Sequence, residues 1–498
     1  MRRRVWAGLA ALALVLAMGG TAATATPTDP CESSYTGTMN STAKLKAYMD
    51  CRLDRLDKGL TPGPTVTVTI TATPSPSVTA TPSPPASATP TATASQTPTA
   101  SPTATTTGLA LAKEPNQPAG DYYAQFPKAA AAGWGKDFIP VSVFLGKPEH
   151  AAQLKAVGIN TYMGAEHDGS QISVITGQGM SVMAQDEWAA TEIGTDTRVV
   201  AWQLSDECDM GYSGCGDSEA AQLAKQTEYA NAARSRNDGR FLSANFGNGV
   251  LRTWWSPNTM PQHVALLDST SVDKYAYTSP HVQGLLPNSP DWPTGVNAKR
   301  AAAYGWQQDQ MERFQGGGST SKPNWVFIET ARPYLTEAGA TIITPDQIEG
   351  GVWSAIIHGA RGIAYFQHHN ATGDETSSNG GCSNYSLVDA GCTANKARVK
   401  AVNAKVQILA PVINSDSYVH NYGAAGIDTM TKQSDGYLYV FAGVGLKGTA
   451  GSKTFALPAG VAGTVEVVGE DRTLNASDGS FSDTFAAEFT HHIYRIKI

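Results

Sequence analysis

The sequence has few charged residues and no long apolar stretch. Only 16% of the 498 residues are charged, acids outnumber bases by 43 to 36, and the formal net charge is -7. A basic surface for binding nucleic acid is therefore not expected. No stretch reaches the ~18 apolar residues that a membrane span needs, so no membrane span is predicted. Low charge combined with 49 glycines and 28 prolines favours a loop-rich exported protein over a helical bundle.

Cysteine is also scarce, with six residues in the whole chain. The sequence contains no Cys-x-x-Cys motif and no His-Cys cluster, so no metal site is predicted. It has no recognisable cofactor motif either, and no cofactor is expected. In an exported protein, cysteines that are close in sequence form disulfides by default. The predicted pairs are Cys31–Cys51, Cys208–Cys215 and Cys382–Cys392.

The first 107 residues divide into three segments by composition. Residues 1–25 carry three arginines, an apolar run and an Ala-x-Ala-like site, which predict a signal peptide and a secreted protein. Residues 26–60 predict a small helical segment stapled by a disulfide, either a plain capped helix or a wall-binding or oligomerising module. Residues 61–107 are rich in Thr, Pro and Ser and lack charge, which predicts a disordered, extended linker. Such a linker is either a tether for work at a surface such as a cell wall, or only a spacer.

Short apolar runs alternate with helical stretches across residues 108–408. Eight predicted strands with intervening helices favour a (β/α)8 TIM barrel. The rival is an open doubly wound sheet, and the absence of Gly-x-Gly-x-x-Gly after the first strand argues against it. The predicted strands cover residues 138–144, 159–163, 181–184, 198–204, 241–245, 272–277, 324–328 and 362–366.

Residues 409–498 have a different pattern. Strand-like pieces at residues 436–441, 465–468 and 491–496 are separated by Gly, Asn and Asp. This pattern predicts a C-terminal antiparallel β-sandwich of about 90 residues.

Carboxylates follow several of the predicted barrel strands, where barrel enzymes place their reacting groups. Glu207 follows the fourth strand and Glu329 the seventh, which would put them on opposite sides of a pocket. A pair of carboxyl groups can hydrolyse a glycosidic bond, one protonating the leaving oxygen and the other attacking or activating water. Further carboxylates after the second and third strands are interpreted as solvated loop residues and kept as reserve candidates: Glu166, Asp186 and Glu187.

Two motifs resemble a known superfamily. VVAWQLSDECD (199–209) and NWVFIETARP (324–333) look like the fourth- and seventh-strand motifs of the clan A (β/α)8-barrel glycoside hydrolases, and DQIEGGVWSAIIHGARGIAYF (346–366) resembles their passage into the eighth strand. The resemblance implies a retaining mechanism, with Glu207 as acid/base and Glu329 as nucleophile. Most members carry Asn immediately before the acid/base Glu, where it binds the sugar 2-hydroxyl. This chain has Asp206 there, which could accept the same hydrogen bond and would raise the pKa of its neighbour.

Other residues are candidates for binding substrate. Tyr277, or Tyr275, is expected to hydrogen-bond the nucleophile, as a Tyr does in many members of the clan; the alternative is a packed barrel tyrosine. Trp254 and Trp255 follow the fifth strand, and one of two adjacent tryptophans is expected to be exposed and to stack on sugars. His368 at the end of the eighth strand would line the pocket, unless it is a structural histidine.

The sequence therefore predicts a secreted glycoside hydrolase that cleaves a polysaccharide, such as a cell-wall or plant glycan. The alternative is a non-catalytic carbohydrate- or wall-binding protein on a degenerate barrel. A metal-dependent barrel hydrolase is disfavoured because no His-x-His follows the first strand.

Overall fold

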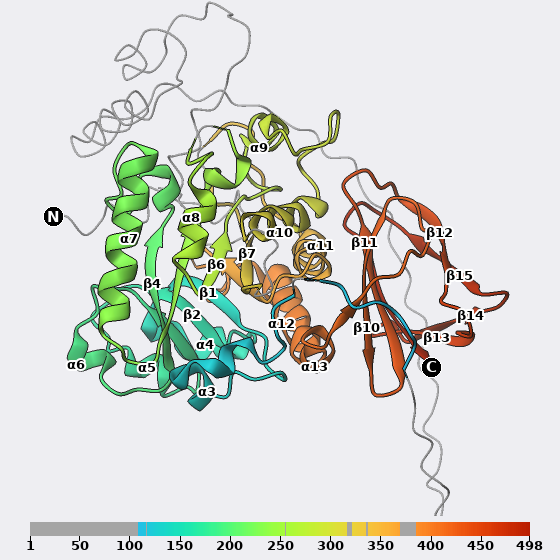
Figure 1. The fold of residues 1–498 in the computed structure, drawn as a ribbon, viewed down its shortest axis with the longest axis horizontal. Coiled ribbons are helices and arrows are strands. Elements are labelled where there is room, and N and C mark those ends of the chain that lie inside the picture. The colour runs from blue at the N-terminus through green and yellow to red at the C-terminus, as the bar shows by residue number, and fades with distance from the viewer. Residues whose placement is uncertain (1–107, 116, 254, 316–320, 335–336, 369–384) are drawn as a thin grey trace, which may run out of the picture.

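The computed structural model describes residues 108–115, 117–253, 255–315, 321–334, 337–368 and 385–498 (Figure 1). The predicted signal peptide, N-terminal segment and linker lie outside these residues. So do Trp254 and at least one cysteine of two predicted pairs, Cys31–Cys51 and Cys382–Cys392. Among the described residues, no helix combines the length and apolarity needed to cross a bilayer.

Eight parallel strands close into a barrel in the order β1 to β8. The ring is completed where β1 pairs with β8, with Val141 opposite Ile363 and Val143 opposite Tyr365. This confirms the predicted (β/α)8 barrel and excludes the open sheet. The strands are β1 (Val141–Gly146), β2 (Thr161–Ala165), β3 (Ser181–Ala184), β4 (Val199–Asp206), β5 (Phe241–Phe246), β6 (Ser269–Val272), β7 (Asn324–Glu329) and β8 (Gly362–Phe366).

The helices surround this sheet, and local signals in the sequence mark where α7 and α11 begin. Ser218 caps α7 by accepting from the Ala221 N–H, and Thr344 and Gln347 form a capping box ahead of α11, with Pro345 in its first turn. The helices are α3 (Pro127–Ala131), α4 (Ala151–Ala156), α5 (Ser173–Thr176), α6 (Ala190–Ile193), α7 (Glu219–Ser235), α8 (Met260–Ala265), α9 (Val282–Leu285), α10 (Ala302–Phe314), α11 (Pro345–Ile357), α12 (Thr393–Ile408) and α13 (Ala410–Ile413), with short 3-10 turns η2 (Tyr122–Gln125), η3 (Pro148–His150), η4 (Cys208–Met210), η5 (Asn248–Leu251) and η6 (Leu286–Asn288).

Aromatic side chains close the N-terminal end of the barrel. Trp134 packs against Phe241 of β5 and Trp325 of β7, with ring centroids 5.6 and 6.1 Å apart. The indole of Trp325 donates to the Tyr123 hydroxyl at 2.7 Å. Because this end is filled, a reaction site is left to the opposite end, where the strands finish.

The sixth strand differs from its prediction. It covers Ser269–Val272, whereas the sequence pattern placed it at 272–277. The Lys274 N–H donates to the Gln307 side chain at 2.9 Å, and that side chain donates back to the Lys274 carbonyl at 2.9 Å. Residues 273–277 therefore form the loop beyond the strand, at the mouth of the barrel.

The C-terminal region consists of two antiparallel sheets that share a core, as predicted. One has the strand order β14-β13-β16-β11-β10-β9 and the other pairs β12 with β15. Phe455 and Phe481 of the smaller sheet pack with Val440 and Tyr494 of the larger one. Leu109 and Leu111 also pack on this core, although the sequence pattern grouped them with the barrel. The strands are β9 (Ser417–Tyr418), β10 (Ile427–Ser434), β11 (Tyr437–Val444), β12 (Gly451–Ala456), β13 (Gly463–Val467), β14 (Arg472–Ala476), β15 (Ser480–Phe485) and β16 (His491–Lys497).

Candidate active site

Glu207 lies directly beyond β4 in a left-handed backbone conformation, with φ at 48°. Its N–H donates to the Asn245 carbonyl of β5 at 3.0 Å, which fixes the turn. The predicted Cys208–Cys215 disulfide is present and closes the loop that follows. A non-glycine residue in this conformation costs about 1–3 kcal/mol and persists where the surroundings hold it, so this backbone is shaped around the glutamate.

The turn after β5 leaves space for the Glu207 carboxyl. A Cβ on Gly247 would lie 2.5 Å from the Glu207 Oε1 and 2.4 Å from the Met210 sulfur. The N–H groups of Gly247 and Gly249 donate to the Asp209 carboxylate at 3.0 and 2.6 Å. Glycine is therefore required here for close approach, and the ends of β4 and β5 are built as one unit.

Asp273 and Lys274 complete the cluster from the loop after β6. The Lys274 Nζ lies 3.7 Å from both the Glu207 Oε1 and the Asp273 Oδ1, with these three side chains no more than 7% exposed. On the other side, the Asn245 amide donates to Asp206 at 2.9 Å. Asp273 and Lys274 were not among the predicted site residues, because the sequence pattern placed them inside the sixth strand. The available signal was a charged pair close after the polar run Ser269–Ser271.

Burial and crowding of like charges determine the protonation of this cluster. Burial and the nearby charge of Asp273 raise the pKa of Glu207 well above its usual range, while Lys274 opposes the rise. Burial and Asp273 also raise the pKa of Asp206 to about 7. Burial raises the pKa of Asp209 to about 6, against the hydrogen bonds from Gly247 and Gly249. A Glu207 that stays protonated at neutral pH can donate a proton.

Glu329 ends β7 and has a different environment. It has no exposed surface. Its Oε1 accepts the backbone N–H groups of Tyr277 and Thr278 at 3.1 and 3.2 Å and the Thr278 hydroxyl at 3.2 Å. Its Oε2 accepts the Tyr304 hydroxyl at 2.6 Å. Donors of this kind stabilise the charged form of a carboxyl group.

The pKa of Glu329 reflects two opposing effects. Burial raises it, and the hydrogen bonds from Tyr304, Thr278 and Tyr277 oppose the rise. A carboxylate has about four lone-pair sites. Since Oε1 accepts three bonds and Oε2 one, Oε2 is the oxygen with capacity for a further partner.

The tyrosine hydroxyl that binds Glu329 comes from an unexpected residue. The sequence predicted that Tyr277 or Tyr275 hydrogen-bonds this glutamate, with a packed barrel tyrosine as the alternative. Tyr277 donates its backbone N–H to Glu329 and turns its hydroxyl to Glu488, at 2.7 Å; the Tyr275 hydroxyl lies 3.4 Å from Asp273. Tyr304 of α10 binds Glu329 instead. Three residues further along, Gln307 holds the Lys274 backbone, and this spacing puts both side chains on one face of the helix.

The remaining candidates lie around the same end of the barrel. Trp255 is 7% exposed and packs on Met210 beside Tyr212, so it is a packed side chain. Trp254 lies outside the described residues, so the prediction that one of the two tryptophans is exposed and stacks on sugars stays a prediction. The His368 Nε2 lies 3.0 Å from the Phe144 carbonyl and its Nδ1 3.8 Å from Glu166. His368 therefore lies at the mouth, on the side of β8, β1 and β2.

The reserve carboxylates have separate surroundings. Glu166 accepts the Tyr385 hydroxyl at 2.9 Å, and burial raises its pKa. Asp186 is 73% exposed and forms an ion pair with Arg236, and Glu187 is exposed. Neither Asp186 nor Glu187 belongs to the buried cluster.

A small pocket lies beside the cluster. It is lined by Asp273, Lys274, Tyr275, Ser279, Val282, Leu285, Leu286 and Tyr334. Glu207 and Glu329 are not among these residues. The charges of Asp273, Glu207 and Glu329 all contribute to the raised pKa of Tyr334, after the effect of burial. Tyr334 is thus near both carboxyl groups as well as the pocket.

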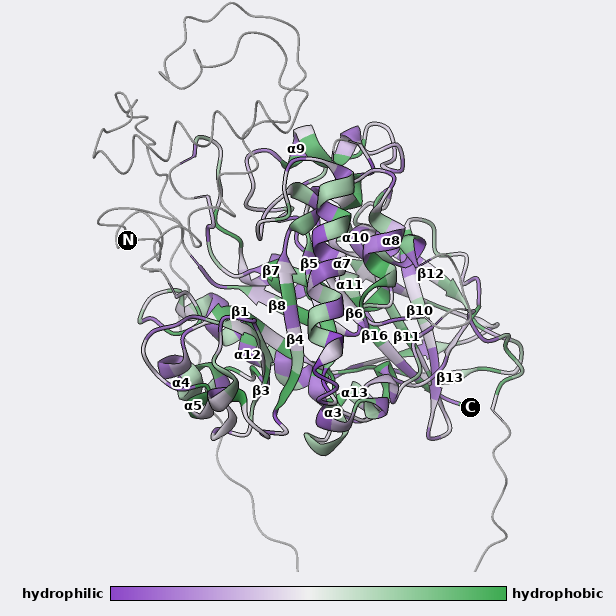
Figure 2. Cartoon of the chain, turned by 60° about the vertical axis from the view of Figure 1, so that its left-hand side comes forward, coloured by the Kyte–Doolittle hydropathy of each residue, from purple (hydrophilic) through white to green (hydrophobic). Residues whose placement is uncertain are grey.

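Helix α7 supports the β4 side through polar side chains. Figure 2 shows hydrophilic and near-neutral residues along most of this helix. Its buried Gln226 accepts the Ser205 hydroxyl at 2.8 Å, and its buried Gln222 accepts the Ser256 hydroxyl at 2.7 Å. The helix therefore lacks a hydrophobic stripe because part of its buried face holds the strand end and the loop around Glu207.

Comparison with known proteins gives a likeness of fold. No protein-family model matches the sequence, and no curated protein matches it. The chain is similar to an alpha-amylase from Anoxybacillus (9% identity, 73% of this chain and 98% of that chain, TM-score 0.43). It is similar to a family 5 glycoside hydrolase from Bacteroides vulgatus, with 12% identity over 72% of this chain and 89% of that chain and a TM-score of 0.41. It is also similar to AmyP in complex with maltose, with 9% identity over 74% of this chain and 98% of that chain and a TM-score of 0.41. These comparisons show a likeness of fold, and no single family is identified.

Proposed function

We propose that this protein is a glycoside hydrolase in which Glu207 is the general acid/base and Glu329 the nucleophile. One observation carries the proposal: two buried carboxyl groups end β4 and β7 of a closed barrel, in opposite hydrogen-bonding environments. Glu207 is crowded by other acids, whereas Glu329 is surrounded by donors. Environments that differ in this way separate the roles of two carboxyl groups in glycosidases.

The proposed reaction proceeds in two steps. The ionised Glu329 attacks the anomeric carbon through Oε2 while Glu207 transfers its proton to the departing glycosidic oxygen, which leaves as an alcohol. Glu207, now ionised, takes a proton from water, and the water oxygen displaces Glu329 from the sugar. Asp206 accepts a sugar hydroxyl beside Glu207. The product keeps its anomeric configuration, and the two carboxyl groups approach to about 5–5.5 Å in the reacting complex.

The substrate and location are also part of the proposal. The export-like first 25 residues and the uncharged Thr/Pro/Ser stretch at 61–107 support a secreted enzyme that works on a polysaccharide, such as a cell-wall or plant glycan, at the surface that holds it.

The test compares three variants on soluble wall and plant polysaccharides, with new reducing ends as the readout. Glu207→Gln and Glu329→Gln should each lower the rate by about 10²–10⁴-fold or more while the protein stays folded. Glu312→Gln is the matched control, because Glu312 is another carboxyl whose pKa burial raises to about 7, on α10. It should keep the wild-type rate.

Three results would contradict the proposal. If Glu329→Gln retains its rate while Glu207→Gln does not, the nucleophile is a different group. If NMR of the first-formed product shows an inverted anomer, the two-step mechanism is wrong. If the wild type cuts no polymer but is retained on one in a pull-down, the barrel is a binding protein.

A further inference from the structure

A carboxylate from the C-terminal sandwich contacts the groups that bind Glu329. Glu488 lies between β15 and β16. Its Oε1 accepts the Tyr277 hydroxyl at 2.7 Å, and its Oε2 accepts the N–H of Ala301 at 2.8 Å. Glu488 thus holds two separate elements of the barrel with its two oxygens.

Each of these two elements also supplies a hydrogen bond to Glu329. Tyr277 donates its own N–H to the Glu329 Oε1. Ala301 immediately precedes α10, which carries Tyr304 one turn further on, and the Tyr304 hydroxyl donates to the Glu329 Oε2. A negative charge at the start of a helix is favourable, because the first N–H groups lack partners within the helix. Glu488 therefore stabilises the start of α10 at Ala302.

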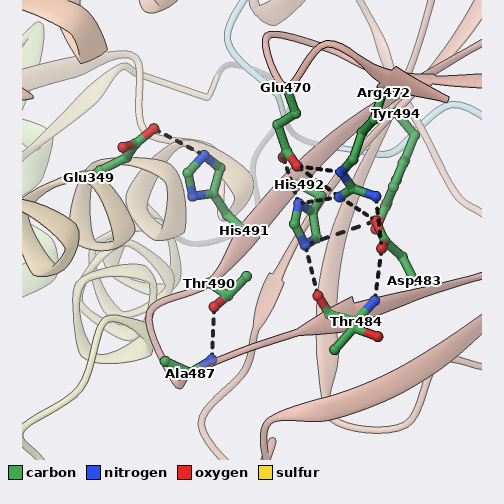
Figure 3. Close-up of polar contacts among 10 residues, drawn as sticks. All are labelled: Glu349, Glu470, Arg472, Asp483, Thr484, Ala487, Thr490, His491, His492 and Tyr494. Carbon is green, nitrogen blue, oxygen red and sulfur yellow. Dashed lines mark hydrogen bonds and ion pairs between the residues drawn. The ribbon is translucent and has the colours of Figure 1, made fainter. Parts of the chain in front are cut away.

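The turn that carries Glu488 is held by its own hydrogen bonds and by contacts of the neighbouring residue. The Ala487 N–H donates to the Thr490 hydroxyl at 2.9 Å (Figure 3), and the Thr490 N–H donates to the Ala487 carbonyl at 3.1 Å. Next to it, His491 stacks on Trp353 of α11 and lies 3.5 Å from Glu349. Arg300 adds a bond from the barrel side, donating to the Gly445 carbonyl at 2.9 Å. The geometry thus transmits the position of the sandwich to the loop after β6 and to α10.

We propose that Glu488 is a positioning residue for Glu329, so that the sandwich is part of the active-site support and not a separate appendage. The inference rests on the proposed function for the reaction itself. Glu488 touches no reacting atom; it acts by keeping the Tyr277 N–H and the Tyr304 hydroxyl aimed at the nucleophile.

The test uses Glu488→Gln in the full chain. The glutamine side chain is uncharged and has one acceptor oxygen in place of two, so it cannot accept from both the Tyr277 hydroxyl and the Ala301 N–H, and α10 can shift. We expect kcat to fall about 10–100-fold with KM nearly unchanged, because a small misplacement of a reacting group is costly. The acidic limb of the rate profile should move up by about 0.5–1 pH unit, since weaker donors favour the protonated form of Glu329.

Two control variants separate positioning from general loosening. Asp428→Asn weakens another bridge across the same interface, because Asp428 of β10 lies 3.1 Å from His358 and lines the same small interdomain cavity as Glu488. Glu470→Gln removes a carboxylate inside the sandwich, where Glu470 lies 2.6 Å from His492 and accepts from Arg472 at 2.8 Å (Figure 3). Both should lower thermal stability without moving the acidic limb.

A second variant tests the route. Tyr277→Phe removes the bond to Glu488 and keeps the N–H on Glu329. Combined with Glu488→Gln, it should add less than its separate effect on kcat, because the two changes break the same contact. Fully additive effects on kcat would show that Glu488 does not act on Glu329 through Tyr277.

The remaining outcomes keep this inference distinct from the proposed function. If Glu329→Gln is inactive but Glu488→Gln keeps the wild-type kcat and acidic limb, the inference fails and the proposed function stands. Hydrogen exchange read by mass spectrometry needs no substrate. Exchange at residues 276–279 and 301–305 should rise in Glu488→Gln and not in Asp428→Asn. An equal rise in both variants, or none in either, overturns the inference.

Discussion

The two sides of the barrel mouth surround a buried carboxyl group with different neighbours. At the ends of β4 and β6, Glu207 shares its surroundings with Asp206 and Asp273, and Lys274 is the cation at 3.7 Å. At the end of β7, Glu329 has donors on both of its oxygens. The first arrangement favours the protonated form and the second stabilises the ionised one.

The difference teaches that position on a barrel strand does not assign a role by itself. Both glutamates follow an apolar strand in the sequence, and both are buried. Their roles separate only through neighbours from other strands and from α10.

Removing the cation of the β4–β6 side should be the most damaging change. Lys274→Met leaves Glu207 and Asp273 without a neighbouring positive charge. Removing one partner of a buried ion pair lowers the free energy of unfolding by about 3–5 kcal/mol. The pKa values of Glu207 and Asp273 are raised, so the folded state favours their protonated forms and loses stability as they ionise. The loss of stability in Lys274→Met should therefore grow from pH 5 to pH 8. Chemical denaturation across this range measures it. An equal loss at both pH values would show that Lys274 acts by packing alone.

Weakening the donors of the β7 side should affect the reaction more than the fold. Tyr304→Phe removes the hydroxyl at 2.6 Å from the Glu329 Oε2. We expect kcat/KM to fall about 10–100-fold and the acidic limb of the rate profile to move upward, with stability reduced by about 1–2 kcal/mol.

A tyrosine on the outer side of β8 gives the matched control for Tyr304. Tyr365 is buried and donates to Asn403 at 2.8 Å. Tyr365→Phe should cost similar stability and leave the rate profile in place. If both variants shift the profile alike, the contrast between the two sides is not the cause.

The acid crowding around Asp206 can be read from stability alone. Its pKa is raised to about 7, against roughly 3.9 in an unfolded chain. The protonated carboxyl group of Asp206 makes its full contribution to the stability of the fold below about pH 4, and this contribution is lost as the pH rises through about 7. Asp206→Asn should therefore stabilise the protein by about 1–3 kcal/mol at pH 8 and hardly at pH 4. A gain that is the same at both pH values would exclude crowding as its source.

The smallest effect is expected outside the cluster. Asp186 is 73% exposed and paired with Arg236, and such surface pairs contribute about 0–1 kcal/mol. Asp186→Asn should change the hydrolysis rate less than about twofold. A loss as large as that of Glu207→Gln would move the site toward β3.

Much of the fold could be read from the sequence, because strand and helix periodicity is local. Seven of the eight barrel strands were predicted at or near their places, and so were the antiparallel C-terminal region and the disulfide of Cys208 with Cys215. The sixth strand was misplaced because the apolar and aromatic residues at 272–277 look like a strand, whereas a side chain 33 residues away holds Lys274 out of the ladder.

The sequence by itself determined the alternation of strands and helices and the carboxyl groups at the strand ends, since both follow from the local order of apolar, polar and turn-forming residues. Only the tertiary structure decided which groups surround each carboxyl. Tyr304, Lys274 and Glu488 reach the site from a helix, a loop and the sandwich. Contacts between residues far apart in the chain form only when the barrel closes and the sandwich docks on it, and no local pattern records them.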